Sequence, residues 1–395
     1  MGSRTALIRA KALVITAGAL LIIGSLDASA GRAMSGVGLA SGKPANAAAV
    51  PSSSTGVPPL GTPMGVPLRG HTRWVTAVAV GKRSDGTHVI VSAGYDRTVR
   101  IWDLETGKAI GKPLKGHRGE IYDVDLGKRS DGTPVIVSGA ADDIRIWNMN
   151  TGKQLGKPLK GRKGLIYALA TGKRSDGTPV VVSTGDGLTR AVEIWNLDTG
   201  KLIGKSPVGY PLTVSQLVTD RRSDGTPVFI TGATDGRARI WNLNSGKPIS
   251  KTLIRCGGSC LVEGLATGKR SDGTPVMVSG DINGDTDAED RADSALRIWN
   301  LDTGMPIGAS IPLQTKGHVK VAVGRRANGS PIIASADDDG KVSVWDLDTG
   351  DPVGAPFTGH DGAVSALATG RRSDGTPVVV SGGLDKTIRV WSLGS

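Results

Sequence analysis

The sequence has few cysteines and few bulky aromatic residues. Its 395 residues include two Cys, two Phe, four Tyr and eight Trp. So few cysteines exclude a disulfide-dense scaffold, and no Cys/His spacing typical of a zinc site occurs. Small and β-branched side chains must therefore fill any core. Glycine is abundant instead, at 58 residues, which indicates many tight turns.

The sequence also lacks an apolar run long enough to be a typical membrane-spanning helix. The longest, Ala12–Leu26, covers 15 residues, whereas a membrane-spanning helix needs about 20. A basic start precedes this run, and an A-x-A pattern ending at Ala30 follows it. We therefore predict a signal peptide over residues 1–30, cleaved after Ala30, and a secreted or cell-envelope protein. An uncleaved amino-terminal membrane anchor is the alternative.

Residues 31–61 are rich in Ala, Gly, Ser and Pro and contain few groups that could bury apolar surface. This composition predicts a disordered tether. The whole chain carries a formal charge of +12, which permits attraction to anionic polymers without determining the fold.

Residues 62–395 consist of a repeated unit, which a tryptophan marks near its end. The markers are Trp102, Trp147, Trp195, Trp241, Trp299, Trp345 and Trp391. They are 45 to 48 residues apart except for one spacing of 58, slightly above the roughly 40 to 45 residues of a four-stranded propeller blade. Each unit contains alternating segments such as Val75–Val80, which is β-strand periodicity. No helical pattern occurs, so we predict an all-β fold.

A turn with almost the same amino-acid sequence recurs in six units, as in Arg129–Thr133. Its Asp-Gly pair is a strong hairpin signal. The strand that follows, such as Pro134–Ser138, is apolar throughout, which predicts burial on both faces, as when sheets stack on one another.

Three units resemble the Gly-His to Trp-Asp frame of the WD-repeat family: Gly70–Asp103, Gly116–Asn148 and Gly359–Trp391. The resemblance implies a seven-bladed β-propeller of four-stranded antiparallel blades. It also implies a binding scaffold, and we predict no enzymatic activity, no catalytic residue and no cofactor. The regular Arg-Ser-Asp-Gly-Thr-Pro-Val spelling is similar to that of actinobacterial WD-repeat proteins.

The last repeated unit ends before it can form its outer strand. Met64–Leu68 has the spelling of an outer strand such as Ile110–Leu114. We therefore expect Met64–Leu68 to complete the last blade and close the ring, which protects sheet edges that would otherwise promote aggregation.

His, Ser and Asp recur with each of several tryptophans and resemble a catalytic triad in composition alone. A nucleophile needs only one site, and in the WD-repeat family such side chains form a structural hydrogen-bonded tetrad. The predicted tetrads are His71, Ser92, Asp96 and Trp102; His117, Ser138, Asp142 and Trp147; His318, Ser335, Asp339 and Trp345; and His360, Ser381, Asp385 and Trp391.

Three units depart from this frame. Arg162 and Tyr210 occupy the His position in two of them, and the fifth unit has Cys256 and Cys260 around that position. In an exported chain these two cysteines could form a disulfide across the Gly-Gly turn between them. The alternative is two small buried apolar side chains.

The long spacing contains an acidic insertion, Asp281–Asp293. Its alternating oxygen ligands could bind calcium, although it lacks the usual Gly after Asp285. A solvated acidic loop is the favoured interpretation, so we predict no metal ligand.

In this family the loops before the first strand and between the second and third strands form one face, the top. Trp74 is the one Trp outside the repeated position, and Arg73, Tyr95 and Arg97 accompany it in the same unit. We expect these four residues to bind a protein or peptide at the top face and central opening.

Two alternatives remain for function. The opposite face carries seven basic pairs, which could bind anionic envelope polymer or lipid headgroups. Nucleic acid is disfavoured because no stacking aromatic residues interleave with these charges. A propeller-fold hydrolase or lyase is the third possibility.

Overall fold

The computed structural model describes residues 56–141, 143–160, 164–184, 191–206, 213–249, 254–255, 260–283, 294–313, 315 and 317–395. In this part the chain forms one compact unit from Val57 to Ser395, whose regular elements are all β-strands. No helix in the described ranges is long and apolar enough to cross a membrane. The compact unit begins at Val57 and therefore includes the last five residues of the predicted tether.

Several predictions concern residues outside the described ranges. These are the signal peptide at 1–30, most of the tether, the tetrad residue Asp142, the Arg162 and Tyr210 positions, Cys256 and most of the acidic insertion.

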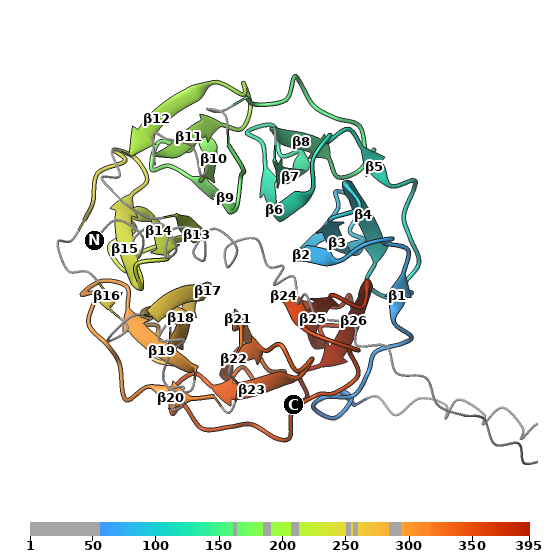
Figure 1. Ribbon diagram of the computed structural model, residues 1–395, viewed down its shortest axis with the longest axis vertical. Coiled ribbons are helices and arrows are strands. Elements are labelled where there is room, and N and C mark those ends of the chain that lie inside the picture. Colours follow the sequence, from blue (N-terminus) through green and yellow to red (C-terminus); the bar gives the residue numbers. More distant parts are fainter. Residues whose placement is uncertain are drawn as a thin grey trace, which may run out of the picture. The chain divides into compact units, whose positions relative to one another are not determined.

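Seven antiparallel sheets are arranged around a central opening, as the resemblance implied (Figure 1). We number these sheets as blades in chain order. Blade 1 contains β2 (Val75–Lys82), β3 (His88–Gly94), β4 (Thr98–Asp103) and β5 (Leu114–Lys115). Blade 2 contains β6 (Ile121–Lys128), β7 (Pro134–Ala140) and β8 (Ile144–Asn148). Blade 3 contains β9 (Leu169–Lys173), β10 (Pro179–Ser183), β11 (Val192–Asn196) and β12 (Leu202–Ser206).

Blades 4 to 7 repeat this order. Blade 4 contains β13 (Val214–Arg221), β14 (Pro227–Ala233), β15 (Arg237–Asn242) and β16 (Ile254–Arg255). Blade 5 contains β17 (Cys260–Lys269), β18 (Pro275–Asn283), β19 (Ala295–Asn300) and β20 (Ile311–Pro312). Blade 6 contains β21 (Lys320–Arg325), β22 (Pro331–Ala336) and β23 (Val342–Asp346). Blade 7 contains β24 (Val364–Arg371), β25 (Pro377–Gly383) and β26 (Thr387–Ser392), with β1 (Leu68–Arg69) at its outer edge.

The fourth strand of blades 2 and 6 is reduced to isolated bridges. In blade 2, Leu159 pairs with Ile144 and Gln154 pairs with Trp147. Val342 and Trp345 make the corresponding bridges in blade 6. The outer edge of each blade is thus covered, so all seven blades keep the four-stranded plan.

The apolar core lies between the blades rather than at the centre of the ring. Seven buried clusters occur, and each joins two neighbouring blades. Strand β3 shows why its sequence is apolar throughout: Val89 and Val91 face blade 2, whereas Ile90 faces blade 7. Each such side chain contributes about 1.5–3 kcal/mol when fully buried. The prediction of second strands buried on both faces is confirmed.

The amino-terminal segment closes the ring by pairing with the last strand. Leu68 pairs with Ile388, and the amide of Met64 donates to the carbonyl of Val390 at 2.8 Å. The pairing continues outward, because the amide of Gly61 donates to the carbonyl of Ser392 at 2.9 Å. The predicted closing strand is therefore confirmed.

Replacing Leu68 by Ala tests this closure. Leu68 is 6 % exposed and packs between blades 1 and 7, so its truncation should lower the free energy of unfolding by about 2–5 kcal/mol. Val66 is two residues away and 82 % exposed, so Val66→Ala should change stability by less than about 0.5 kcal/mol. Urea unfolding measures both variants, and equal effects would contradict the closure.

Candidate functional site

Every blade contains a hydrogen bond from its marker tryptophan to a hydroxyl on the second strand. The pairs are Trp102–Ser92, Trp147–Ser138, Trp195–Ser183, Trp241–Thr231, Trp299–Ser279, Trp345–Ser335 and Trp391–Ser381, with distances of 2.8–3.1 Å. This hydrogen bond joins the second and third strands inside each blade.

Blades 1 and 7 extend this pair to the complete predicted tetrad. In blade 1, His71 Nδ1 lies 2.9 Å from Asp96 Oδ2, and His71 Nε2 lies 2.8 Å from Ser92 Oγ. In blade 7, the structure brings His360, Ser381 and Asp385 together at 2.8 and 3.0 Å. These tetrads tie the loop before the first strand to the turn between the second and third strands.

The tetrad serine cannot serve as a nucleophile, because it is sealed inside the blade. Ser92 and Ser381 have no exposed surface, and their Oγ atoms already accept from tryptophan. Burial alone would raise the pKa of the Asp96 carboxyl, but hydrogen bonds from His71 and Thr98 outweigh it and lower that pKa. The carboxylate thus stays charged and holds its loop.

In blade 2 the described carboxylate beside the histidine is that of Asp143, whereas the predicted Asp142 lies outside the described residues. His117 Nδ1 lies 2.8 Å from Asp143 Oδ1, and Arg145 contacts the same carboxylate at 3.0 Å. The turn after β7 is one residue shorter than the corresponding turn of blade 1, which brings the residue just before β8 into the partner position.

Blade 6 corrects one prediction, because His318 and Asp339 do not form a tetrad with Ser335. His318 Nδ1 lies 3.5 Å from Glu263 Oε2 of blade 5, and Asp339 is exposed beside Lys341. The physical reason is a short loop. His318 precedes the inner strand β21 by only two residues, whereas His71 precedes β2 by four residues and can fold back over its blade.

The nearly invariant Arg-Ser-Asp-Gly-Thr turn has a structural role on the bottom face, where the inner strands end. Its Arg and Ser contact the next blade: the Arg83 guanidinium donates to the carbonyl of Asn150, and the Ser84 amide donates to Asn150 Oδ1 at 3.1 Å. We call this contact the bottom clasp. In the described part, the same serine amide contact occurs at six blade junctions.

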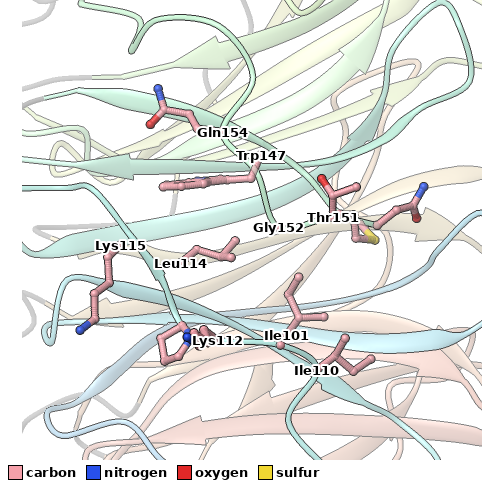
Figure 2. A pocket seen from close by; sticks show the side chains of 13 residues that line it. Ile101, Ile110, Lys112, Leu114, Lys115, Trp147, Thr151, Gly152 and Gln154 are labelled. Atoms are coloured by element: carbon pink, nitrogen blue, oxygen red, sulfur yellow. The ribbon is translucent and has the colours of Figure 1, made fainter.

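A groove opens at the outer edge between blades 1 and 2. Its volume is about 430 Å³, and Figure 2 shows Leu114, Ile101 and Ile110 together with Trp147 in its walls. A groove of about 350 Å³ occupies the equivalent place between blades 2 and 3. Because the groove recurs with the repeat, it reflects blade packing and singles out no blade.

A β-bulge near the start of the inner strand distinguishes the blades from one another. Among the described residues it occurs in five blades and places one side chain out of the alternating pattern: Thr76, Tyr122, Ser215, Glu263 and Ser365. The three hydroxyls at this position each donate to carbonyls of their own blade and of the next blade. A small hydroxyl is therefore the structural solution, and the Tyr and Glu residues depart from it.

Tyr122, the tyrosine at the bulge position, belongs to a row of four aromatic rings at the top face, which we call the aromatic row. The Trp74 and Tyr95 rings lie 5.5 Å apart, Tyr95 and Tyr122 5.8 Å, and Tyr122 and Tyr167 5.6 Å. The row runs across blades 1, 2 and 3. Trp74, Tyr95 and Tyr122 are half-buried, whereas Tyr167 is buried.

The backbone holds the first two rings together. The Tyr95 amide donates to the Trp74 carbonyl at 3.0 Å, and a Cβ at Gly94 would lie only 2.4 Å from that carbonyl oxygen. Burial, and then the neighbouring Tyr122, raise the pKa of Tyr95, so its hydroxyl remains neutral at physiological pH.

The other two predicted site residues lie beside this row. Arg73 is exposed and pairs with Glu120 at 3.6 Å. Arg97 is exposed and has a φ of 63°, at the turn position where blade 4 has Gly236. A left-handed conformation costs a non-glycine residue about 1–2 kcal/mol, so Arg97 is held in a strained place.

Glu263, the glutamate at the bulge position of blade 5, lies close to charged residues of blade 6. Glu263 is 5 % exposed, its Oε2 lies 3.9 Å from Lys320 Nζ, and Oε1 has no hydrogen-bond partner. Burial would raise the pKa of Glu263, but His318 and Lys320 outweigh this effect and lower it. The charge of Lys320 also acts on Asp123 of blade 2, on the other side of the opening (Figure 1).

Asp123 and Asp125 join blade 2 to blade 3. They accept from the amides of Leu169 and Thr171 at 2.8 and 2.7 Å, where blade 1 has Ala77 and Ala79. Burial raises the pKa of Asp123 to about 7. In the described residues, no group of three or more His, Cys, Asp or Glu is placed to hold a metal ion.

These features define the class of protein: a closed seven-bladed β-propeller whose blades share one internal hydrogen bond and differ at the top of the opening. Residues 61–103 and 350–392 match the model of the family described as WD domain, G-beta repeat. These two segments are therefore WD40 repeats, and the seven-bladed propeller is the fold that the resemblance to the WD-repeat family implied. Proteins of this family are typically scaffolds rather than enzymes, and the fold points to interaction with other proteins.

One relative is similar over a single repeat. A probable E3 ubiquitin ligase complex SCF subunit, sconB of Arthroderma otae, is 56 % identical over 43 residues. The match covers 11 % of this chain and 6 % of that protein. The likeness thus concerns the repeat alone.

Replacing Asp143 by Asn tests its contact with His117. The change removes the negative charge that lies beside His117 and Arg145, so the free energy of unfolding should fall by about 1–3 kcal/mol. Asp339→Asn is the matched control and should change it by less than about 0.5 kcal/mol, because that side chain is 62 % exposed. Larger destabilisation by the control than by Asp143→Asn in thermal or urea unfolding would reject this assignment.

The tetrads also predict how the free energy of unfolding changes at acidic pH. The pKa values of Asp96 and Asp385 are lowered in the folded state from 3.8, so the unfolded chain takes up protons first as the pH falls. The two carboxylates stabilise the fold fully at any pH above 3.8, their ordinary pKa. This stabilisation is lost as the pH falls through their pKa values in the folded state. The double variant Asp96→Asn, Asp385→Asn should be less stable at neutral pH and lose less stability between about pH 5 and pH 2. Urea unfolding across this range measures both slopes, and identical slopes would show that the tetrads do not set acid stability.

Proposed function

We propose that this protein is an interaction scaffold that binds a segment of a partner protein at its top face, over the aromatic row. The observation that carries the proposal is the row itself. Tyr122 and Tyr167 stand where blades 4 and 7 have serine hydroxyls that join one blade to the next. Large rings at this place are not needed for the repeat, so their contribution lies at the surface that they form.

The row has the physical properties of an interface anchor. Aromatic side chains bury much area for little loss of conformational freedom, and Trp, Tyr and Arg dominate the binding energy of protein interfaces. Contacts between successive rings hold Trp74, Tyr95 and Tyr122 in place before a partner arrives. Such preorganisation reduces the entropy lost on binding.

Charged groups around the aromatic row would favour one orientation of a bound peptide. Arg73 and Glu120 lie at its blade 1 and blade 2 side, and Arg97 extends from the neighbouring turn. Glu263 and Lys320 belong to blades 5 and 6. A peptide segment lying across the opening would meet apolar rings at one end and paired charges at the other, which favours one orientation over its reverse.

The experiment uses the partner that purifies with the wild-type protein and measures its affinity for variants by biolayer interferometry. Tyr122→Ser installs the residue that blades 4 and 7 carry at this place, so the fold accommodates it. Both Tyr122→Ser and Trp74→Ala should weaken binding at least tenfold, about 1.4 kcal/mol.

Met305→Ala is the matched control, because Met305 is an apolar side chain that is 58 % exposed in a turn between a third and a fourth strand. It should leave the affinity unchanged. If Met305→Ala weakens binding while Trp74→Ala and Tyr122→Ser do not, the partner binds elsewhere and the proposal is wrong.

A further inference from the structure

The bottom face carries two circles of cations with different surroundings. The outer circle is the second residue of each basic pair, such as Arg129 and Arg222, which makes the bottom clasp and pairs with Asp198 or Asp302 of the next blade. The inner circle is the first residue of each pair. Its members are Lys82, Lys128, Lys173, Arg221, Lys269, Arg325 and Arg371, all exposed. In the described residues, the ion pairs of this face involve the outer circle alone.

Three arginines of the inner circle are fixed without being neutralised, and two of them, Arg325 and Arg371, belong to neighbouring blades. Arg221 of blade 4 donates to the carbonyls of Gly225 at 2.8 Å and Lys173 at 3.1 Å. Arg325 donates to the carbonyls of Gly329 at 2.8 Å and Lys269 at 3.1 Å. Arg371 donates to the carbonyls of Gly375 at 2.9 Å and Arg326 at 3.3 Å. Carbonyl acceptors orient a guanidinium and leave its full positive charge, so these groups are preorganised for an anion.

Blade 6 also lacks the acidic residue of its turn. Six blades have Asp at this place, for example Asp272 and Asp374 on either side, whereas blade 6 has Asn328. Asn328 Oδ1 accepts from the Ser330 amide at 3.0 Å, the same contact that Asp272 makes with Thr274. The turn is therefore preserved while its negative charge is removed, and the local positive potential is higher here than at the other blades.

A pocket of about 290 Å³ lies at this place, between the inner strands of blades 5, 6 and 7. Lys269, Arg325 and Arg371 line it with the hydroxyl-bearing residues Thr267 and Thr369, and none of its lining residues is acidic. Its volume is at the lower end of the range for small-molecule sites, which suits a compact, highly charged group.

We propose that this pocket is a binding site for oligophosphate, held by Arg325, Arg371 and Lys269. Phosphate oxygens match the donor geometry of guanidinium groups, and charge-assisted hydrogen bonds of this kind are the stronger ones. The site lies on the opposite face from the aromatic row and is independent of the partner proposed for that row. Soluble oligophosphates and phosphate headgroups of lipids share the chemistry that it recognises.

Isothermal titration of the full chain with inorganic tripolyphosphate tests the site. Arg325→Gln with Arg371→Gln should reduce the association constant at least tenfold. The matched control is Lys82→Gln with Lys128→Gln, which removes the same charge from the same circle in blades 1 and 2, whose turns keep Asp85 and Asp131. The control should reduce the association constant less than threefold. Equal losses in both variants would show diffuse attraction to a basic face, and no binding at millimolar ligand would also overturn the proposal.

Lys269→Gln tests the pocket with a variant that should fold normally, because the Lys269 side chain is exposed and lines the pocket. It should weaken binding at least threefold with an unchanged Tm, and Lys128→Gln should not; the reverse order would reject the site. Vesicles of phosphatidylcholine with and without phosphatidic acid separate the two sources of phosphate. Binding to the acidic vesicles that tripolyphosphate displaces assigns the pocket to lipid headgroups, and binding of tripolyphosphate alone assigns it to soluble oligophosphates.

Discussion

The fold depends on one constraint: no blade can bury both faces of its own sheet. Each apolar cluster is shared by two neighbours, so a blade is stable only between two others, and the first and last blades must meet. Pairing of Leu68 with Ile388 joins the first and last blades, because it places residues from both ends of the ring in one sheet. The same pairing leaves no long unpaired strand edge at the junction.

The repeated residues of the sequence are explained by this constraint. The marker tryptophan joins two strands within a blade, and the Arg-Ser pair joins one blade to the next through the bottom clasp. These contacts recur around the ring and therefore cannot distinguish one binding surface from another. We therefore place the proposed binding sites where a blade departs from this rule, as at Tyr122, Glu263 and Asn328.

Much of the architecture could be predicted from the sequence, because the tryptophan spacing counts the blades and the spelling of Met64–Leu68 matches an outer strand. The error at blade 6 arose where the chain length changes by a few residues, because a shorter loop turns His318 toward Glu263. In blade 2 a shorter turn places Asp143 beside His117, and the predicted Asp142 lies outside the described residues.

The candidate site was predicted in part. Trp74 and Tyr95 were identified because they break the repeat, and the structure places their rings in contact. Tyr122 and Tyr167 were missed. Alternation along a strand does not show that a bulge turns Tyr122 out of register, and Tyr167 lies before the strand of its own unit. Aligning the seven units at the inner strand would have exposed them, since serine or threonine stands there in three other units.

The central claim is a ring closed by its amino-terminal segment, and native-state hydrogen exchange tests it most directly. The amide of Met64 donates to Val390 and that of Ser392 donates to Thr62, whereas the Val91 amide belongs to the core of blade 1. The account predicts that the Met64 and Ser392 amides exchange with free energies of opening close to that of Val91, because opening the closure unfolds the ring. Exchange of Met64 and Ser392 at the rate of an exposed loop, with Val91 still protected, would contradict it.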